Sequence, residues 1–172
     1  MADNNIIIRN VKVVTPTGDS ARRGSSMSEL SVTGDASIVI TDGIITYVGP
    51  SDDIRIVADV DYNILEGDGN VALPGFVDSH THLIFGGFRP DEFEWRLKGD
   101  SYMSIMERGG GIQSTVNATR EESLDALVEK ARWFVDRMVE MGVTTVEAKS
   151  GYGLDTESEI KMLDAIDTIA RD

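Results

Sequence analysis

Two short apolar segments, 76–80 and 143–147, flank a long amphipathic segment, and this arrangement constrains the fold of the chain more than any other feature. Both short segments are typical of buried strands. Between them, apolar side chains recur at helical spacing, at Leu124, Leu127, Val128, Ala131, Val135, Met138 and Val139. A second helical pattern follows at Ile160, Leu163, Ile166 and Ile169. The order strand, helix, strand, helix predicts an α/β fold in which helices cover a parallel sheet.

Capping signals indicate where the two helices begin. Thr119 is followed three residues later by Glu122, and Thr156 by Glu159, which is the pattern of a capping box. We therefore expect one helix from Thr119 to Met141 and another from Thr156 onward.

Two shorter amphipathic segments, 91–98 and 101–108, come before these helices and are followed by three glycines at 109–111. The glycines follow a helical pattern and lack the G-x-x-x-x-G-K-[ST] spacing of a phosphate-binding loop. A phosphate site is therefore not expected there.

The N-terminal part has a different pattern: residues 1–70 resemble a small antiparallel β unit, and 71–172 form the α/β part. Runs of β-branched residues predict strands over 6–14, 37–41, 44–48 and, more weakly, 54–60. Asp42-Gly43 between two of these runs predicts a tight hairpin. The segment 17–34 is rich in Ser, Gly and Arg and is expected to be a long surface loop.

Charge and composition exclude several functional classes. The chain has 172 residues and a net charge of −14, from 16 Lys+Arg and 30 Asp+Glu. So acidic a chain is a poor partner for nucleic acid, which needs clustered Lys and Arg. The absence of cysteine excludes disulfides and thiolate chemistry. No apolar run approaches the ~20 residues that span a bilayer, and the polar start lacks a secretion signal. We expect a cytoplasmic protein with no membrane partner.

The two histidines of the chain, His80 and His82, stand at the end of the predicted strand 76–80. Residues two apart in a strand share one face, so both imidazoles are expected side by side. Two neutral imidazoles form half of a zinc or iron site. Asp78 shares their face and is expected to orient the first imidazole. The alternative is that all three are ordinary polar residues at a strand end.

The stretch Leu73–His82, preceded by a small β unit, resembles the amidohydrolase superfamily. Six further blocks of the chain are similar to the imidazolonepropionase family, which is part of that superfamily. They lie at 82–89, 92–97, 99–102, 109–116, 118–120 and 147–154. The resemblance implies that 71–172 are the first βα units of a (β/α)8 barrel, incomplete in this chain. It implies that 1–70 are half of a composite β-sandwich, and that His80 and His82 ligate one catalytic zinc or iron.

The resemblance also implies roles for residues beyond the histidine pair. Arg89 is expected to hold the carboxylate of a substrate, and Tyr102 and Tyr152 to contact it. Glu147 and Lys149 are expected to support the site from the strand end. Without the resemblance, Arg89 would be interpreted as a solvated loop arginine, Tyr102 as packing and Glu147–Lys149 as a structural ion pair. Tyr152 differs, because a tyrosine between two glycines is poorly placed for core packing.

The activity that the resemblance implies is hydrolysis of 4-imidazolone-5-propanoate to N-formimidoyl-L-glutamate, a step of histidine degradation. The family also uses histidine and carboxylate residues from later strands, and no histidine follows His82. We therefore interpret the chain as the N-terminal portion of a longer enzyme. It is expected to be inactive alone, to hold no catalytic proton-transfer residue of its own, and to form a homodimer at full length. The alternatives are another cyclic-amide amidohydrolase, a deaminase, or a non-catalytic module that binds a small carboxylate or a partner chain.

Overall fold

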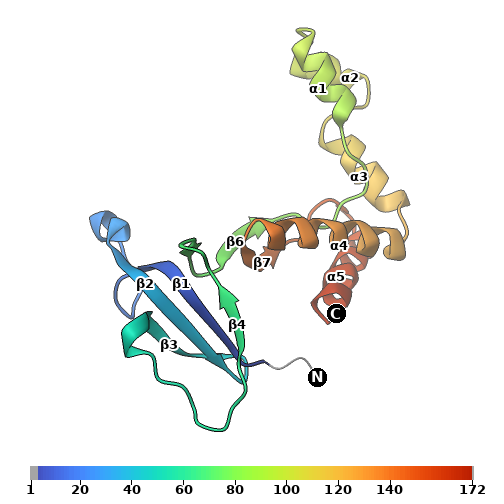
Figure 1. Cartoon of the computed structure of the whole chain (residues 1–172). Coiled ribbons are helices and arrows are strands. Elements are labelled where there is room, and N and C mark those ends of the chain that lie inside the picture. Colours follow the sequence, from blue (N-terminus) through green and yellow to red (C-terminus); the bar gives the residue numbers. More distant parts are fainter. Residues whose placement is uncertain (1–3, 172) are drawn as a thin grey trace. The chain divides into compact units, whose positions relative to one another are not determined.

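The chain forms two compact units, Met1–Pro74 and Gly75–Asp172. The structure is a computed structural model and describes residues 4–171 (Figure 1). None of the helices within 4–171 is both long enough and apolar enough to cross a bilayer.

The first unit is a five-stranded mixed sheet. Its strands are β1 (Ile6–Pro16), β2 (Leu30–Thr41), β3 (Ile44–Pro50), β4 (Asn63–Glu66) and β5 (Val71–Ala72), with short 3-10 turns η1 (Gly24–Ser28) and η2 (Ser51–Asp53). The order is β3-β2-β1-β4, and β5 also pairs with β1. Both β4 and β5 run parallel to β1. The prediction of a purely antiparallel unit is therefore wrong, because the chain after β3 crosses to the far side of β1.

In this unit the sequence correctly predicts the Asp42-Gly43 hairpin, but not the length of the loop 17–34 or the strand at 54–60. Asp42 and Gly43 have φ values of 51° and 78°, as a two-residue type I′ hairpin requires, which confirms the predicted turn. The predicted loop 17–34 is shorter than expected, because β2 begins at Leu30 and pairs with the end of β1. No strand forms at 54–60; the next strand is β4 instead.

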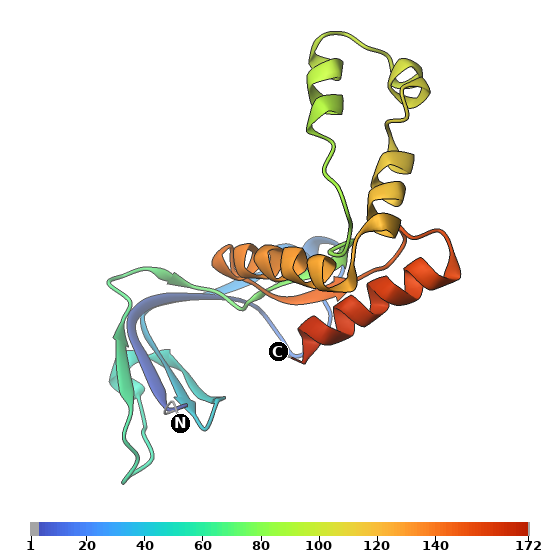
Figure 2. The same ribbon diagram turned by 90° about the vertical axis from the view of Figure 1, so that its right-hand side faces the viewer.

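The second unit has the predicted strand, helix, strand, helix order. The parallel strands are β6 (Phe76–Thr81) and β7 (Val143–Ala148), α4 (Leu124–Glu140) connects them, and α5 (Thr156–Ala170) follows. Three further helices, α1 (Pro90–Leu97), α2 (Tyr102–Glu107) and α3 (Ile112–Glu121), lie between β6 and α4 in the chain. Helix α4 packs on both α5 and β7 (Figure 2). The α/β class is confirmed for this unit.

The helix predicted from Thr119 to Met141 is in fact two helices. Thr119 lies inside α3, and α4 begins after Ser123, whose hydroxyl accepts the Ala126 N–H at 3.2 Å. The prediction that Thr119 caps this helix is therefore wrong, because Thr119 is completely buried within α3 and Ser123 takes the N-cap position.

Helix α5 begins at Thr156, as predicted, but its N-cap is the residue before the predicted capping box. The Asp155 carboxylate accepts the Ser158 N–H at 2.8 Å and takes the N-cap position in place of Thr156. This hydrogen bond, aided by the Arg120 guanidinium 2.9 Å away, holds the pKa of Asp155 below its ordinary value. The carboxylate therefore stays ionised at the positive end of the helix dipole.

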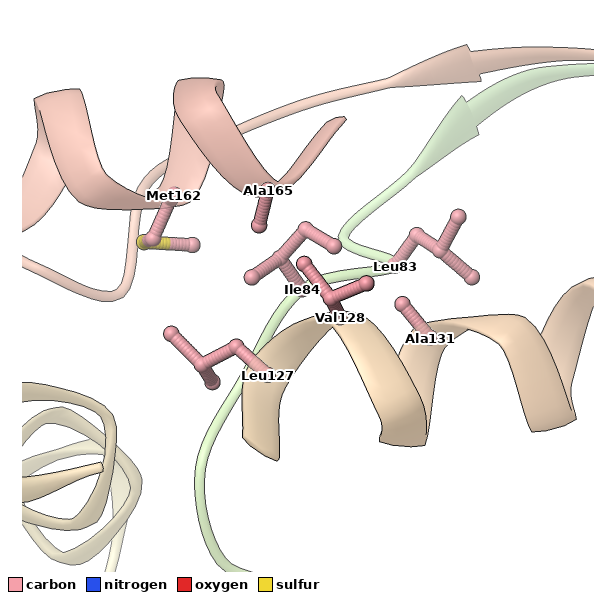
Figure 3. Close-up of a cluster of buried hydrophobic side chains, with 7 residues drawn as sticks. All are labelled: Leu83, Ile84, Leu127, Val128, Ala131, Met162 and Ala165. Atoms are coloured by element: carbon pink, nitrogen blue, oxygen red, sulfur yellow. The ribbon is translucent and has the colours of Figure 1, made fainter. Parts of the chain in front are cut away.

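The core of the second unit forms where the chain leaves β6. Leu83 and Ile84 insert between α4 and α5, and Ile84 has no exposed surface (Figure 3). The helices contribute the other buried members of this cluster, Leu127, Val128, Ala131, Met162 and Ala165. Burial of one such leucine or isoleucine stabilises the fold by about 1.5–3 kcal/mol. The segment directly after the histidine pair is thus anchored in the core of the unit.

Gly86 and Thr119 join this segment to α3 by a close backbone approach. A Cβ on Gly86 would lie 2.2 Å from the Ala118 carbonyl carbon, so only glycine fits. The Thr119 Oγ1 accepts the Gly86 N–H at 2.8 Å and donates to the Thr115 carbonyl at 2.7 Å. One buried hydroxyl therefore satisfies a backbone donor from outside its own helix.

We predict that Thr119→Val lowers the free energy of unfolding by about 1–3 kcal/mol, because it leaves the buried Gly86 N–H without an acceptor. Chemical denaturation monitored by circular dichroism measures this. The matched control is Thr168→Val on α5, where an exposed threonine donates to the Asp164 carbonyl at 2.8 Å. That change should stay within about 0.5 kcal/mol. Equal losses for both variants would show that the Gly86 hydrogen bond contributes nothing.

Candidate functional site

A cavity of about 410 Å³ opens beside the end of β6 in the second unit. Its walls contain three of the residues predicted from sequence, His82, Arg89 and Tyr152. The remaining lining residues are Phe85, Gly87, Phe88, Glu92, Phe93, Arg96 and Thr115. We call this space the His82 cavity. It combines an imidazole, two guanidinium groups and an aromatic wall, which suits a planar ring that carries an anionic group.

The two imidazoles lie side by side, as the spacing along β6 predicts. The ring centroids of His80 and His82 are 5.5 Å apart, with the rings at 65°. The Nδ1 atom of His82 is buried and has no hydrogen-bond partner among the described residues. A buried polar atom without a partner is costly, so this nitrogen is suited to a ligand that the protein itself does not supply.

A metal ion fits this arrangement only in part. Imidazole nitrogens are common ligands of zinc and iron, and the pair could supply two of them. Within residues 4–171, no group of three or more His, Asp or Glu side chains is placed to hold an ion. The described residues therefore offer a metal ion no more than these two neighbouring imidazoles.

Asp78 does not contact an imidazole in the way its position predicts. Its Oδ1 accepts the backbone N–H of His80 at 3.1 Å, which ties the carboxylate to the strand itself. It therefore acts on the backbone that carries the first histidine.

Arg89 lies at the start of α1 and reaches the His82 cavity. Its Nη1 is 3.3 Å from Oε2 of Glu92, three residues further along the helix. The Arg89 side chain remains 36% exposed while that of Glu92 is 9% exposed. The Arg89 guanidinium therefore pairs with Glu92 and is still accessible from the cavity.

Tyr152 occupies the loop after β7, and its ring centroid is 5.1 Å from that of His82. Gly151 has φ +135°, and a Cβ there would lie 2.9 Å from Cε1 of His82. Glycine is thus required for the loop to approach the imidazole. Tyr152 lines the cavity, but it is also packed, partly buried, against the core cluster of Leu83 and Ile84. The expectation that this tyrosine is poorly placed for core packing is therefore wrong.

Glu159 holds the Tyr152 loop in place, a role that the sequence did not indicate. Its Oε1 accepts the N–H groups of Gly153 and Leu154, both at 2.8 Å. Burial alone would raise the pKa of Glu159, but hydrogen bonds from Ser150, Leu154, Gly153 and Gly151 hold it below its ordinary value. In sequence this residue fits a capping box, so the local pattern concealed its contact with the loop.

The other predicted residues lie outside the cavity wall. Tyr102 begins α2 and is 57% exposed. The turn between α1 and α2 separates it from the cavity-lining residues of α1. Glu147 and Lys149 form an ion pair at the end of β7, and the hydrogen bond from Lys149 holds the pKa of Glu147 below its ordinary value. The backbone N–H of Lys149 donates to the Thr81 carbonyl at 2.8 Å, so this segment also ties the ends of β6 and β7 together.

The three glycines at 109–111 form a helix cap. Gly109 donates to the Met106 carbonyl and Gly110 to the Ile105 carbonyl, the two bonds of a Schellman motif. The Gly111 N–H donates to Oε1 of Glu92 at 2.7 Å. Since all three N–H groups have internal acceptors, none is available to a phosphate.

The chain is similar in sequence to several imidazolonepropionases. It is 60% identical to the imidazolonepropionase of Phocaeicola vulgatus, over 96% of this chain and 40% of that protein. It is 47% identical to that of Clostridium tetani, over 100% of this chain and 42% of that protein. The chain thus spans about 40% of the length of these relatives. No family model matches it.

Solved structures show a related fold. Guanine deaminase from E. coli superposes with a TM-score of 0.59 at 18% identity, over 96% of this chain and 34% of that one. Triazine hydrolase from Arthrobacter aurescens gives 0.59 at 22% identity, over 97% and 34%. In sequence, the chain is therefore a homologue of the imidazolonepropionases over about 40% of their length.

Proposed function

We propose that this chain is the N-terminal portion of an enzyme that hydrolyses 4-imidazolone-5-propanoate to N-formimidoyl-L-glutamate, in the degradation of histidine. The observation that supports this most is the composition of the His82 cavity, where one imidazole of a histidine pair, Arg89 and Tyr152 face the same space. The relatives that share 47–60% of its residues are imidazolonepropionases, which supports the same reaction.

The architecture proposed for the longer protein is a metal-dependent (β/α)8 barrel with a composite β-sandwich. Strand β6, helix α4, strand β7 and helix α5 would be the first units of the barrel, and the mixed sheet of the first unit would be half of the sandwich. The amidohydrolase folds that the chain matches over about a third of their length support this. We further propose a cytoplasmic homodimer for the complete enzyme.

His80 and His82 are proposed to hold one zinc or iron ion. The buried, unpartnered Nδ1 of His82 and the neighbouring rings support this. Zinc is named for one neighbour of similar fold, an atrazine chlorohydrolase from Arthrobacter aurescens with a TM-score of 0.51. The chemistry that such a metal supplies is activation of a water molecule for attack on a ring carbonyl. The remaining ligands and the proton-transfer groups would come from outside the described residues.

The substrate is proposed to bind through its carboxylate and its ring. Arg89 would clamp the propionate, since a guanidinium matches a carboxylate in bidentate geometry. Tyr152 and Phe85, whose rings are 6.5 Å apart, would border the imidazolone ring. This local positive charge lets an acidic protein bind an anion.

Four further residues have proposed supporting roles. Tyr102 is proposed as a substrate contact on the family resemblance, and its exposed position on α2 leaves it available for this. Asp78 would hold the backbone of His80, while Glu147 and Lys149 would hold the end of β7 beside it.

Substrate profiling of the full-length protein tests the proposed reaction. We expect metal-dependent loss of 4-imidazolone-5-propanoate with formation of N-formimidoyl-L-glutamate, and no turnover of guanine or of simple cyclic amides that lack a carboxylate. Turnover of guanine with none of the imidazolone would favour a deaminase. Binding of small carboxylates without any turnover would favour a non-catalytic module.

The first prediction for the site concerns the metal. In the full-length protein, replacing His80 and His82 together by alanine should reduce the bound zinc or iron to background, because catalytic sites rest on about three protein ligands. Elemental analysis by mass spectrometry measures the stoichiometry. Ser79→Ala, at an exposed position directly before His80, is the control and should retain the metal. Unchanged stoichiometry in the double variant would contradict the assignment.

The second prediction concerns Arg89. Arg89→Ala in the full-length enzyme should raise KM by an amount equivalent to about 2–5 kcal/mol, because the substrate carboxylate loses its partner. Steady-state kinetics with 4-imidazolone-5-propanoate and with an analogue lacking the propionate measures this. The KM for the analogue should not change in Arg89→Ala. The control is Arg137→Ala, which removes an exposed arginine of α4 and should leave the KM of both substrates unchanged. A similar loss for both substrates with Arg89→Ala would mean that Arg89 is structural.

The third prediction concerns the 172-residue polypeptide by itself. It should not hydrolyse 4-imidazolone-5-propanoate with added zinc or iron, because residues 4–171 offer no three-ligand cluster. The assay is run beside the full-length protein as a positive control. Metal-dependent turnover by the short polypeptide would show that two histidines suffice.

A further inference from the structure

Glu92 is a buried carboxylate that connects the His82 cavity to the glycine turn 109–111. Its residue is 7% exposed, and glutamate is rarely buried unless it is paired. Each carboxylate oxygen has a separate partner: Oε2 lies 3.3 Å from Nη1 of Arg89, and Oε1 accepts the Gly111 N–H at 2.7 Å. One side chain thus links a cavity arginine to a backbone turn 19 residues further along the chain.

The glycine turn is shaped to receive this carboxylate. A Cβ on Gly110 would lie 2.9 Å from Oε1 of Glu92 and 2.7 Å from Cγ2 of Ile105, so a side chain there would displace the acid. Gly111 has φ +75° and is the N-cap of α3. Its N–H donates at the positive end of that ten-residue helix, where a carboxylate is stabilised. The block of three glycines therefore has a use beyond ending α2.

Arg89 differs from the other arginine of the cavity because it has a fixed partner. Arg96 also lines the His82 cavity, and no ion pair involving it is found within residues 4–171. A long side chain with no partner has more rotamer freedom to lose when a ligand binds. Of the two, Arg89 is the guanidinium whose orientation is set before a ligand arrives.

We propose that Glu92 is a positioning residue that orients Arg89 toward the substrate carboxylate, with the Gly109–Gly111 turn fixing Glu92 in turn. The inference rests on the proposed function, in which Arg89 binds the propionate. It adds a second residue and a backbone anchor to the recognition of the carboxylate, and it predicts an effect that operates only through Arg89.

Glu92→Gln separates the two contacts of the carboxylate. A glutamine side chain has a single acceptor oxygen, which can keep the Gly111 N–H, while its amide NH₂ then faces Arg89. The substitution therefore retains the turn and removes the acceptor that holds the guanidinium. Glu94→Gln is the matched control, since Glu94 lies on the same helix, is exposed and pairs with Lys98 instead.

The experiment uses the metal-loaded full-length enzyme. Glu92→Gln should raise KM for 4-imidazolone-5-propanoate by about tenfold while kcat changes by less than about threefold, because a charged hydrogen bond that orients the ligand-binding group is lost. Calorimetry should show about the same loss for 3-(imidazol-4-yl)propanoate and almost none for 4-propylimidazole, which lacks the carboxylate. Glu94→Gln should leave all of these values unchanged.

A double-mutant cycle shows whether the effect passes through Arg89. In an Arg89→Met background, Glu92→Gln should add less than about twofold to KM, because residues that act through one contact are not additive. An equal further loss in that background, or equal losses for the carboxylate ligand and its neutral analogue, would overturn the proposal and leave Glu92 a structural residue.

Turnover by the wild-type enzyme and calorimetry with the two ligands distinguish failure of this proposal from failure of the proposed function. If the wild-type enzyme does not turn over the imidazolone, the proposed reaction fails, and the calorimetric comparison still decides the role of Glu92. Wild-type protein that binds neither ligand would overturn the proposal as well. Should Glu92→Gln not fold by itself, thermal melts of Arg89→Met and of the Arg89→Met/Glu92→Gln pair replace it: the pair should melt higher than Arg89→Met, because Arg89→Met leaves Glu92 buried without its cation, whereas glutamine is neutral and still accepts the Gly111 N–H. A lower melting temperature for the pair would contradict the coupling.

Discussion

Burial of Leu83 and Ile84 between α4 and α5 is the interaction on which the candidate site depends. These residues follow His82 directly, and they lie five to six positions before Arg89. Because they are locked in the core, the strand end that carries the imidazoles has little freedom to move. The hydrogen bond from the Lys149 N–H to the Thr81 carbonyl adds a second restraint at the same level of the sheet. The hydrophobic core thus fixes the positions of the two imidazoles and of the segment that leads to Arg89.

Around this core, backbone and carboxylate contacts complete the site. Gly86 approaches α3, and Gly151 approaches the His82 ring, at distances that only a residue without Cβ permits. Glu92 and Glu159 each use a carboxylate to hold a glycine-rich loop by its N–H groups. These two carboxylates of an acidic chain therefore serve as hydrogen-bond acceptors for backbone N–H groups within the protein. The loops that they hold carry or adjoin the residues that face the cavity.

Several features of the structure were accessible from local sequence patterns. The strands β6 and β7, the apolar faces of α4 and α5, and the Asp42-Gly43 hairpin each correspond to a residue pattern within a short segment of the chain, which hydrophobic periodicity and turn chemistry describe directly. The neighbouring imidazoles of His80 and His82 follow from the two-residue repeat of a strand. The resemblance to imidazolonepropionases also depends on sequence alone.

The remaining features depend on partners far apart in the chain. Capping boxes are present in the sequence at Thr119 and Thr156, but the helices are capped by Ser123 and Asp155 instead, and the burial of Thr119 and the hydrogen bonds of Asp155 appear only in the tertiary structure. The parallel pairing of β4 with β1, and the contact of Glu92 with Gly111, join segments that no local period connects. Tertiary packing decided these because a buried polar group must find its partner wherever the fold provides one. The sequence by itself determined β6, β7, the apolar faces of α4 and α5, the Asp42-Gly43 hairpin and the histidine pair, because each depends on a local residue pattern. The tertiary structure alone decided which loops, caps and carboxylates hold the cavity in shape.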